Sequence, residues 1–296
     1  MSETKADRPA AGATLSRTVL VSFLGSIVRK MGNWMPIAGT VALLAESGLD
    51  TSSVRTAVFR LKKRGWLESE TRAGMRGYRL TPTALDALAV GDEVIWHARQ
   101  PADLGDGWCL VNFSVPESAR AMRHQLTAHL ASLGFGNIGS AVWIAPARML
   151  PAAQRAFAEL DLTRYCAVFV GDYVAGQELT TMVRNGWDLD GIDQRYREFI
   201  QDHRKEADRL AAAEVIGGRQ AFVTYLSVID RWRKLPFRDP GLPSEVLTED
   251  WNGPAAVHLF ERMVAMLEGR ALAHAAPHWS AQPKPPGPPG EGGATG

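Results

Sequence analysis

This chain of 296 residues has few cysteines and no long apolar runs. Its two cysteines, Cys109 and Cys166, lie far apart, each within an apolar run. That usage excludes a disulfide framework and favours a reducing, cytoplasmic compartment. No apolar run approaches the roughly 18 to 20 residues that a membrane-spanning helix needs, so we expect no membrane partner. The apolar segment 19–28 is followed rather than preceded by basic residues, which argues against a signal peptide.

The sequence also lacks the common motifs of enzymes. It has no P-loop, no glycine-rich dinucleotide-binding turn after a strand, no H-E-x-x-H and no G-x-S-x-G. His124 and His129 are five residues apart on one predicted helix, which is poor spacing for shared metal ligation. We therefore expect a protein that is not an enzyme and that carries neither a resident cofactor nor a metal.

The formal net charge is small, at +1, but it is unevenly distributed. The segment from Arg17 to Arg79 contains eleven basic and four acidic residues, a net charge of +7, which leaves −6 for the rest of the chain. A basic module attached to an acidic body is typical of a regulator with separate DNA-binding and sensing parts.

Apolar residues at helical spacing predict three elements in the N-terminal third. A first helix covers 18–31, a second begins at Pro36, and a later one covers 83–97. Residues 66–80 instead alternate as two short strands about a turn at 74–77. This part of the chain therefore predicts a small helical module that carries a β-hairpin.

A third helix, between the second helix and the hairpin, is the most informative segment. Thr51, Ser52 or Ser53 supplies its N-cap, and it ends near Arg64. Its inward positions are Val54, Ala57, Val58 and Leu61. The remaining faces are polar and basic. A basic helix face alone has an ordinary alternative, because many solvated helices carry one.

Arginines on the hairpin favour a nucleic-acid interface over that alternative. A basic helix followed by an arginine-bearing hairpin is typical of a winged helix-turn-helix, whose helix enters the major groove of duplex DNA. Arg55 and Arg60 are suited to guanine or to phosphate, whereas the later lysines and the wing are suited to phosphate. The candidate DNA-binding residues are Ser52, Ser53, Arg55, Thr56, Arg60, Lys62, Lys63, Arg72, Arg76 and Arg79.

The middle of the chain changes from helical to mixed periodicity. We predict a strand over 108–115, a helix over 118–134, two short strands within 136–146, a helix over 151–162 and a strand over 165–174. The order β-α-β-β-α-β predicts a ferredoxin-like α+β domain.

The chain is mainly helical from about Glu178, and tryptophans are frequent there. Trp187 and Trp232, together with Arg231 and Arg233, are candidates for holding an anionic aromatic effector by stacking and charge. The alternative is that the tryptophans fill a helical core or a dimer contact.

The sequence therefore predicts an α+β multidomain protein. Its parts are a disordered tail (1–16), a winged helix-turn-helix domain (17–99), a ferredoxin-like central domain (100–177), a helical effector and dimerisation domain (178–276) and a disordered tail (277–296). Six prolines and five glycines among the last twenty residues favour the assignment of the second tail.

Three motifs resemble the PaaX family of bacterial repressors. They are VRTAVFRLKKRGWL (54–67), with the wing ending in YRLT (78–81), WDLDGIDQRYREFI (187–200) and RWRKLPFRDPGLPSEVLTEDWNG (231–253). The likeness extends over about 20–267 in the same three-part order, and the second and third motifs are not general features of winged helices.

The resemblance implies a homodimer that binds operator DNA, represses genes of aromatic catabolism and releases DNA when phenylacetyl-coenzyme A or another acyl-coenzyme A binds. It also implies that the central domain is similar to a CRISPR-associated integrase subunit. Arg55, Thr56, Arg60 and Lys63 match the recognition helix of the family, and Arg76 and Arg79 match its wing.

Two alternative functions stay open. A metal-dependent nuclease would follow from the likeness to the integrase subunit, but it needs a carboxylate at the end of the first central strand. That position holds Asn112, Phe113, Ser114 and Val115. A scaffold that binds DNA without responding to a ligand is the second alternative.

Overall fold

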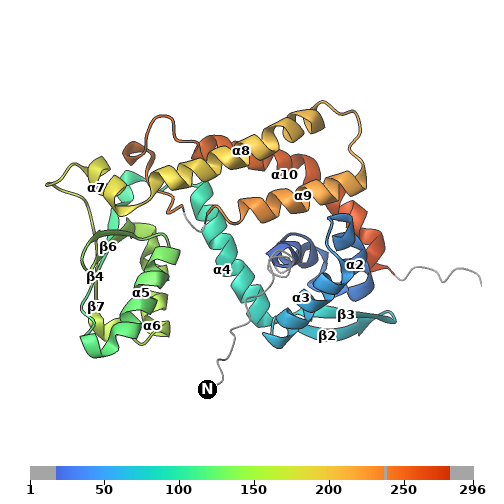
Figure 1. Ribbon diagram of the computed structural model, residues 1–296, viewed down its shortest axis with the longest axis horizontal. Helices are drawn as coiled ribbons and strands as arrows, with labels where there is room; N and C mark the ends of the chain where they lie inside the picture. Colours follow the sequence, from blue (N-terminus) through green and yellow to red (C-terminus); the bar gives the residue numbers. More distant parts are fainter. Residues whose placement is uncertain (1–17, 237–238, 281–296) are drawn as a thin grey trace, which may run out of the picture.

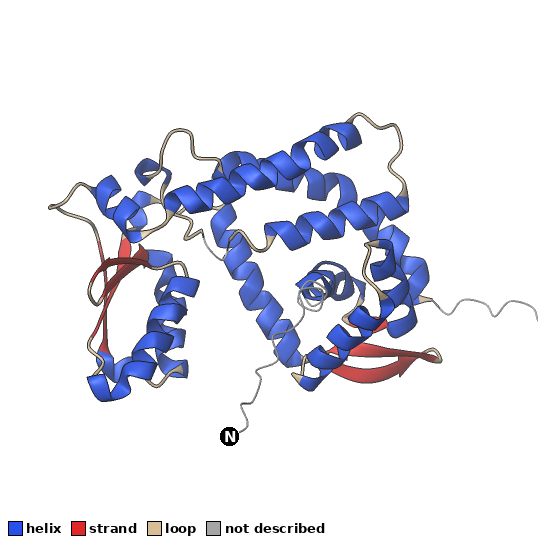
Figure 2. Cartoon of the chain, viewed as in Figure 1, coloured by secondary structure: helices blue, strands red, loops and turns tan. Residues whose placement is uncertain are grey.

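The computed structural model describes residues 18–236 and 239–280. Figure 1 shows three parts: a sheet with helices α5 and α6 on one side, a layer of helices α8, α9 and α10, and a module containing α2, α3, β2 and β3. Helix α4 runs between them, and Figure 2 shows that the strands are confined to two small sheets. The tail predicted at 1–16, and residues 281–296 of the tail predicted at 277–296, lie outside the described residues.

The N-terminal module consists of a helical segment and three further helices around a small sheet. Residues 18–23 are helical and continue through η1 (Leu24–Val28) and η2 (Arg29–Met31). The elements that follow are β1 (Trp34–Pro36), α2 (Ile37–Glu46), α3 (Thr51–Lys63), β2 (Leu67–Arg72), β3 (Met75–Leu80) and α4 (Pro82–Arg99). The sheet has the order β1-β3-β2 and is antiparallel. Sequence reasoning missed β1, because three residues are too short to show an alternation.

Helix α3 forms where it was predicted, but its N-cap is different. Asp50 is the N-cap, and its carboxylate accepts a hydrogen bond from the Ser53 backbone N–H at 2.8 Å. Our assignment of the cap to Thr51, Ser52 or Ser53 is therefore wrong by one position at least. Gly65 follows the helix with φ of +76°, a conformation that favours glycine and ends the helix.

The apolar face of α3 is seated as expected. Val54, Ala57, Val58 and Leu61 are all buried and pack with the first helical segment. Burying each of Val54, Val58 and Leu61 stabilises the module by about 1.5–3 kcal/mol before entropy is counted, and the methyl group of Ala57 adds less. The opposite face of α3 is thereby left to solvent.

The central part has the predicted order of elements. It comprises β4 (Trp108–Phe113), α5 (Arg120–Ser132), β5 (Gly136–Gly139), β6 (Val142–Pro146), α6 (Leu150–Glu159) and β7 (Cys166–Gly171). The short turns η3 (Leu104–Asp106), η4 (Glu117–Ala119), η5 (Ala147–Met149) and η6 (Thr163–Tyr165) connect them. The sheet order is β5-β6-β4-β7, with every pair antiparallel. Helices α5 and α6 cover one face of this sheet (Figure 1).

The two cysteines are free thiols in this sheet. Cys109 is buried and Cys166 is half-buried, and burial raises the pKa of each thiol to about 11. A thiol with so high a pKa is a poor nucleophile at neutral pH, so both act as small apolar side chains.

The remaining residues form a helical layer. Its elements are α7 (Leu179–Gly186), α8 (Leu189–Ala211), α9 (Gly218–Trp232), η7 (Ser244–Val246), α10 (Gly253–Ala275) and η8 (Ala276–Trp279). Trp232 stacks on Phe260 with the ring centroids 4.5 Å apart. A single apolar cluster joins α8, α9 and α10 to the N-terminal module, so the predicted first and third domains share one core.

The C-terminal end of this layer corrects a predicted boundary. Residues 277–280, which we assigned to a disordered tail, are described, and three of them belong to η8. The Trp279 indole N–H donates a hydrogen bond to the Trp34 carbonyl oxygen at 2.7 Å. The segment thus packs on the N-terminal module. None of the helices within 18–236 and 239–280 is long and apolar enough to span a lipid bilayer.

Candidate nucleic-acid interface

The outer face of α3 presents the predicted side chains to solvent. Ser52, Arg55, Thr56, Arg60, Lys62 and Lys63 are exposed, and Ser53 is half-buried. Within the described part of the chain, Arg55, Arg60 and Lys63 form no ion pair. These three cations are therefore available to a polyanion without first breaking an internal contact.

The start of α3 is less available than predicted. The Ser52 hydroxyl donates to the Asp50 carboxylate at 2.6 Å, and the same carboxylate accepts from the Ser53 backbone. Hydrogen bonds from Ser52 and Ser53 lower the pKa of Asp50, which keeps a negative charge at the helix N-terminus. That charge disfavours a phosphate at this position, so the serines are suited to a base edge or to capping alone.

Two of the three wing arginines have acidic partners. Arg72 forms an ion pair with Glu70 at 2.7 Å and lies over the Trp34 ring, 5.3 Å from its centroid. Arg79 forms an ion pair with Glu68, its partner in the β2–β3 register. All four carboxylate and guanidinium groups are near the surface, where such pairs contribute only about 0–1 kcal/mol.

Arg76 differs from the other two wing arginines. Its side chain is exposed and makes no ion pair with the residues that the structure describes. It lies in β3 opposite Thr71, next to the turn at Ala73 and Gly74, where both residues have positive φ. Of the three wing arginines, Arg76 would therefore contact a phosphate with the smallest cost in free energy, because it need not first leave an ion pair with a described residue.

Helix α3 and the wing meet in a hollowed surface. One hollow of about 420 Å³ is lined by Arg55, Phe59, Lys62, Lys63 and Tyr78, among others. A second, of about 460 Å³, is lined by Arg55 and by the wing residues Arg76 and Tyr78. Arg55 lines both, so it connects the helical and wing parts of the predicted site.

Lys62 joins the helix to the wing instead of standing free. Its ammonium donates to the Ser69 hydroxyl at 2.8 Å and lies 5.9 Å from the centroid of the Tyr78 ring. These contacts orient α3 relative to the hairpin while leaving the charge exposed.

Phe59 belongs to this surface, and our candidate set left it out. Its side chain is 66% exposed and sits between Arg55 and Lys63, one turn away in either direction. The helical period already placed Phe59 on the outer face, and an apolar ring at an outward position was the available signal.

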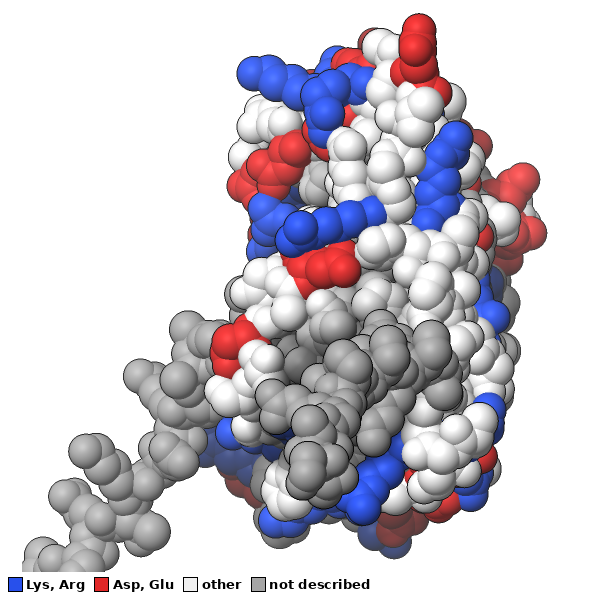
Figure 3. All heavy atoms as spheres, turned by 90° about the vertical axis from the view of Figure 1, so that its right-hand side faces the viewer, with Lys and Arg blue, Asp and Glu red and all other residues white. Residues whose placement is uncertain are grey.

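Acidic side chains interrupt the basic surfaces. Figure 3 shows the face seen from the right of Figure 1, where Lys and Arg alternate with Asp and Glu over the upper part. Basic side chains also reach the lower edge of this view, again with acidic ones among them. The candidate surface for nucleic acid is therefore the local cationic one formed by α3 and Arg76.

The four candidate effector residues do not come together. Trp187 lies in an apolar cluster apart from that of Trp232, and its indole N–H donates to the Gly134 carbonyl oxygen at 2.8 Å. Arg231 is exposed and pairs with Asp202 at 2.5 Å. Trp232 and Arg233 line a common cavity, so only this pair stays a plausible unit.

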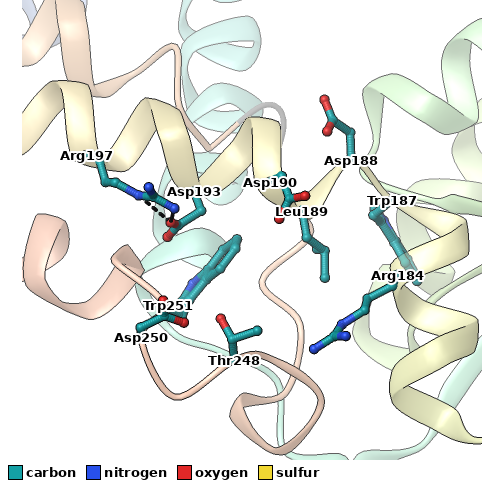
Figure 4. Close-up of a pocket in the computed structure, with 10 residues that line it drawn as sticks. All are labelled: Arg184, Trp187, Asp188, Leu189, Asp190, Asp193, Arg197, Thr248, Asp250 and Trp251. Carbon is teal, nitrogen blue, oxygen red and sulfur yellow. Dashed lines mark hydrogen bonds and ion pairs between the residues drawn. The ribbon is translucent and has the colours of Figure 1, made fainter.

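Trp187 instead lines a cavity between α7, α8 and the segment before α10 (Figure 4). Its volume is about 560 Å³, and its charged lining consists of Arg184, Asp188, Asp190, Asp193, Arg197 and Asp250. Four carboxylates against two guanidinium groups disfavour an anionic ligand. The second and third family-like motifs both contribute residues to this cavity.

Asp193 in that cavity is buried and holds two elements together by its contacts. The sequence did not reveal this role. Asp193 pairs with Arg197 at 2.6 Å and accepts a hydrogen bond from the Asn252 backbone N–H at 2.7 Å (Figure 4 shows the first contact). Asp188 is the N-cap of α8 and accepts from the Gly191 N–H at 3.0 Å. Asp193 therefore connects α8 to the start of α10.

The cavity lined by Trp232 and Arg233 has the opposite character. It measures about 480 Å³ and lies between the first helical segment, α4, α9 and α10. Its lining is mostly apolar, with Arg29, Lys30 and Arg233 against Asp92 and Glu268. The Trp232 indole nitrogen is buried without a hydrogen-bond partner in the described structure.

The central sheet offers little for nuclease chemistry. Asn112 is exposed near the end of β4, where such an enzyme needs a carboxylate. Among the described residues, no three His, Cys, Asp or Glu side chains of the central part bring their donor atoms together as metal ligands would.

Comparison with protein families gives three consecutive matches. Residues 15–84 match a family described as PaaX-like protein, 101–183 match the PaaX protein central Cas2-like domain, and 187–277 match the PaaX-like protein C-terminal domain. These three matched segments follow the three parts of the fold in chain order.

Individual relatives agree with these matches. The chain is 29% identical over 265 residues to the transcriptional repressor PaaX of Escherichia coli (strain K12), covering 88% of this chain and 83% of that protein. The solved structure of the uncharacterized protein Rv0674 from Mycobacterium tuberculosis has the same fold, with a TM-score of 0.58 and 20% identity over 90% of this chain and 99% of that one. On its sequence, its three-part order and its fold, this chain belongs to the PaaX family.

Proposed function

We propose that this protein is a transcriptional repressor that grips duplex DNA with α3 and the β2–β3 wing. The observation that carries the proposal is the outer face of α3, where Arg55, Arg60 and Lys63 are exposed and form no ion pair with the described residues. Arg76 of the wing lines one hollow together with Arg55. The name of the Escherichia coli relative supports repression.

The architecture supports a winged helix-turn-helix for this module. Helices α2 and α3 follow each other across a short turn, and the β2–β3 hairpin comes directly after α3. In such a module the N-terminal half of α3 faces base edges, and later positions meet the backbone. Arg55 is therefore assigned to a base edge, and Lys62, Lys63 and Arg76 to phosphates. Arg60 lies in the second half of α3, where a guanidinium can contact either a guanine or a phosphate.

The central part supports a ferredoxin-like domain and a homodimer. Its chain order is βαββαβ, and its sheet places the first strand between the third and the fourth. Strand β7 is an edge, with Phe169 62% and Val170 51% exposed. An unpaired edge with exposed apolar side chains is suited to a second copy of the chain, which would bring two winged modules to two half-sites.

The effector is an aryl-acyl thioester or a related aromatic acid, and the cavity at Trp232 and Arg233 is its site. The apolar walls suit an aromatic acyl group. Arg29, Lys30 and Arg233 pair with Asp92, Glu268 and Asp230, so an anionic group of the ligand would exchange with these carboxylates. The cavity at Trp187 does not suit such a ligand, because its mainly acidic lining repels an anion.

Repression would end through a shift in population. The cavity at Trp232 is bounded by the first helical segment and α4 of the DNA-binding module, and by α9 and α10 of the helical layer. A ligand that prefers a wider spacing of these helices would favour a dimer geometry that mismatches the operator. The protein would act in the cytoplasm, and the genes that it controls would belong to aromatic catabolism.

An operator fragment titrated with the protein tests this function directly. We expect specific binding that weakens steeply with salt, and release by an aryl-acyl-coenzyme A thioester. Binding without release would support a scaffold, and cleavage of labelled nucleic acid with Mg²⁺ or Mn²⁺ would support a nuclease. Absence of duplex binding at low salt would contradict the proposal.

A further inference from the structure

Three potential metal ligands meet where the helical layer contacts the DNA-binding module. Glu46 is the last residue of α2, His274 lies near the end of α10, and His278 belongs to η8. One donor atom from each lies within 4.8 Å of the other two. His274 Nε2 is already 2.9 Å from a Glu46 carboxylate oxygen, across 228 positions of sequence.

Close backbone packing holds these three side chains in place. The carbonyl oxygen of His278 lies 2.4 Å from where a Cβ at Gly39 would be, so only glycine lets η8 approach α2 this closely. The Trp279 indole is bonded to the Trp34 carbonyl oxygen. The His274 ring packs against Gly218, at 3.0 Å from its ideal Cβ position. The donor atoms are therefore positioned by the fold and not by chance surface rotamers.

The local field favours a cation at this point. Glu46 and His274 lie at the C-terminal ends of α2 and α10, where each helix carries a partial negative charge, and Glu46 adds a full one. Among the residues that the structure describes, Arg219 forms an ion pair with Glu46 at 3.7 Å. Its side chain is 72% exposed, so it can withdraw into solvent when a metal ion enters.

We propose that Glu46, His274 and His278 form a binding site for a divalent transition-metal ion of the zinc class. Two imidazoles and one carboxylate are a three-ligand set that leaves a fourth position for water. Imidazole selects zinc, nickel or cobalt over the hard ions magnesium and calcium, which prefer oxygen. Small side-chain rotations bring the donors from their present spacing to the roughly 2.0–2.2 Å metal–ligand distances of such a site.

The consequence is a cross-link between two parts of the protein. Glu46 belongs to the helix that precedes α3, whereas both histidines belong to the end of the helical layer. A bound ion would hold α2 against η8 and fix the orientation of the DNA-binding module. This site is separate from the cavity at Trp232 and from the outer face of α3. A test of metal binding therefore does not depend on the proposed effector.

Calorimetric titration of the full-length, tag-free and metal-stripped protein with Zn²⁺ tests the site. We expect saturable binding of one ion, and no binding of Mg²⁺. Removing a group that only supports a metal ligand costs about 10–100-fold in affinity, so His278→Ala and Glu46→Gln should each cost at least as much. His124→Ala, which removes an exposed imidazole from α5, should leave the affinity unchanged.

A second readout separates loss of ligation from loss of folding. Co²⁺ in a site with nitrogen ligands gives a visible absorption band, which should appear in the wild type and in His124→Ala but not in His278→Ala. Circular dichroism should show the same helix content in all three. Equal Zn²⁺ affinity in the wild type and His278→Ala, or several equivalent weak ions per chain, would overturn the proposal. Neither result would alter the expectation for operator binding by metal-free protein, which tests the repressor function separately.

Discussion

Arg79 and Glu68 face each other across the two strands of the wing and form an ion pair. The pair is exposed on both sides, with side-chain accessibilities of 45% and 53%. The wing thus holds one of its arginines beside a carboxylate when no DNA is present. A phosphate would have to compete with Glu68 for that guanidinium, so we expect the glutamate to weaken DNA binding.

The first prediction concerns this competition. Glu68→Gln removes the competing charge and one source of repulsion toward phosphate, so operator affinity should rise by up to about fivefold, the equivalent of one surface ion pair. Fluorescence anisotropy at fixed salt measures it. The double variant Glu68→Gln/Arg79→Gln should lose the gain, and a gain that persists there would mean that Arg79 is not involved.

The second prediction concerns Arg76 as a phosphate contact. Arg76→Ala should weaken binding to specific and unrelated duplexes by similar factors and reduce the slope of log affinity against log salt by about 1. Lys205→Ala, an exposed cation on α8, is the control and should leave both quantities unchanged. A selective loss for the operator alone would assign Arg76 to a base instead.

The third prediction concerns Phe59. Its ring is exposed, so Phe59→Ala should change the free energy of unfolding by no more than about 0.5 kcal/mol. Operator affinity should nevertheless fall, since an outward apolar ring beside Arg55 is placed to contact a thymine methyl group or a sugar. Thermal unfolding and anisotropy together separate the two effects. Loss of stability with unchanged affinity would show that the ring serves the fold.

The fourth prediction concerns the cavity at Trp232. Gly91 in α4 lines it, and a Cβ there would meet no atom within 4 Å. Gly91→Leu should fill the cavity, gain helix propensity of less than about 0.8 kcal/mol, and give a repressor that binds the operator but no longer releases it with effector. Gly269→Leu in α10, also in open space, is the matched control. Normal release by Gly91→Leu would place the effector elsewhere.

Local patterns in the sequence predicted the elements well. The buried stripe of α3 at Val54, Val58 and Leu61 and its basic outer face follow from helical spacing alone. Turn residues such as Gly65 marked the ends correctly, because their backbone conformation is set within a few residues. Our prediction of the three-stranded sheet lacked β1, because β1 pairs with β3, a strand more than forty positions later in the sequence.

Contacts between distant parts could not be predicted. The sequence suggested Trp187 and Trp232 as one effector group, yet the fold places them in separate clusters. The pairing of Asp193 with Asn252 depends on how α8 packs against the start of α10, and that of Glu46 with His274 on how α2 packs against the end of α10. The pairing of Arg79 with Glu68 was visible only once the strand register was known.

The double variant Arg55→Ala/Arg60→Ala gives the most direct test of the central claim that the outer face of α3 reads duplex DNA. Each arginine paired with a guanine contributes about 1–3 kcal/mol. Measured by anisotropy on a duplex selected by the wild-type protein, the affinity of the folded double variant should fall by at least about 30-fold and its preference for the selected sequence should disappear. Unchanged affinity and unchanged preference, in a variant whose thermal unfolding matches the wild type, would contradict the account.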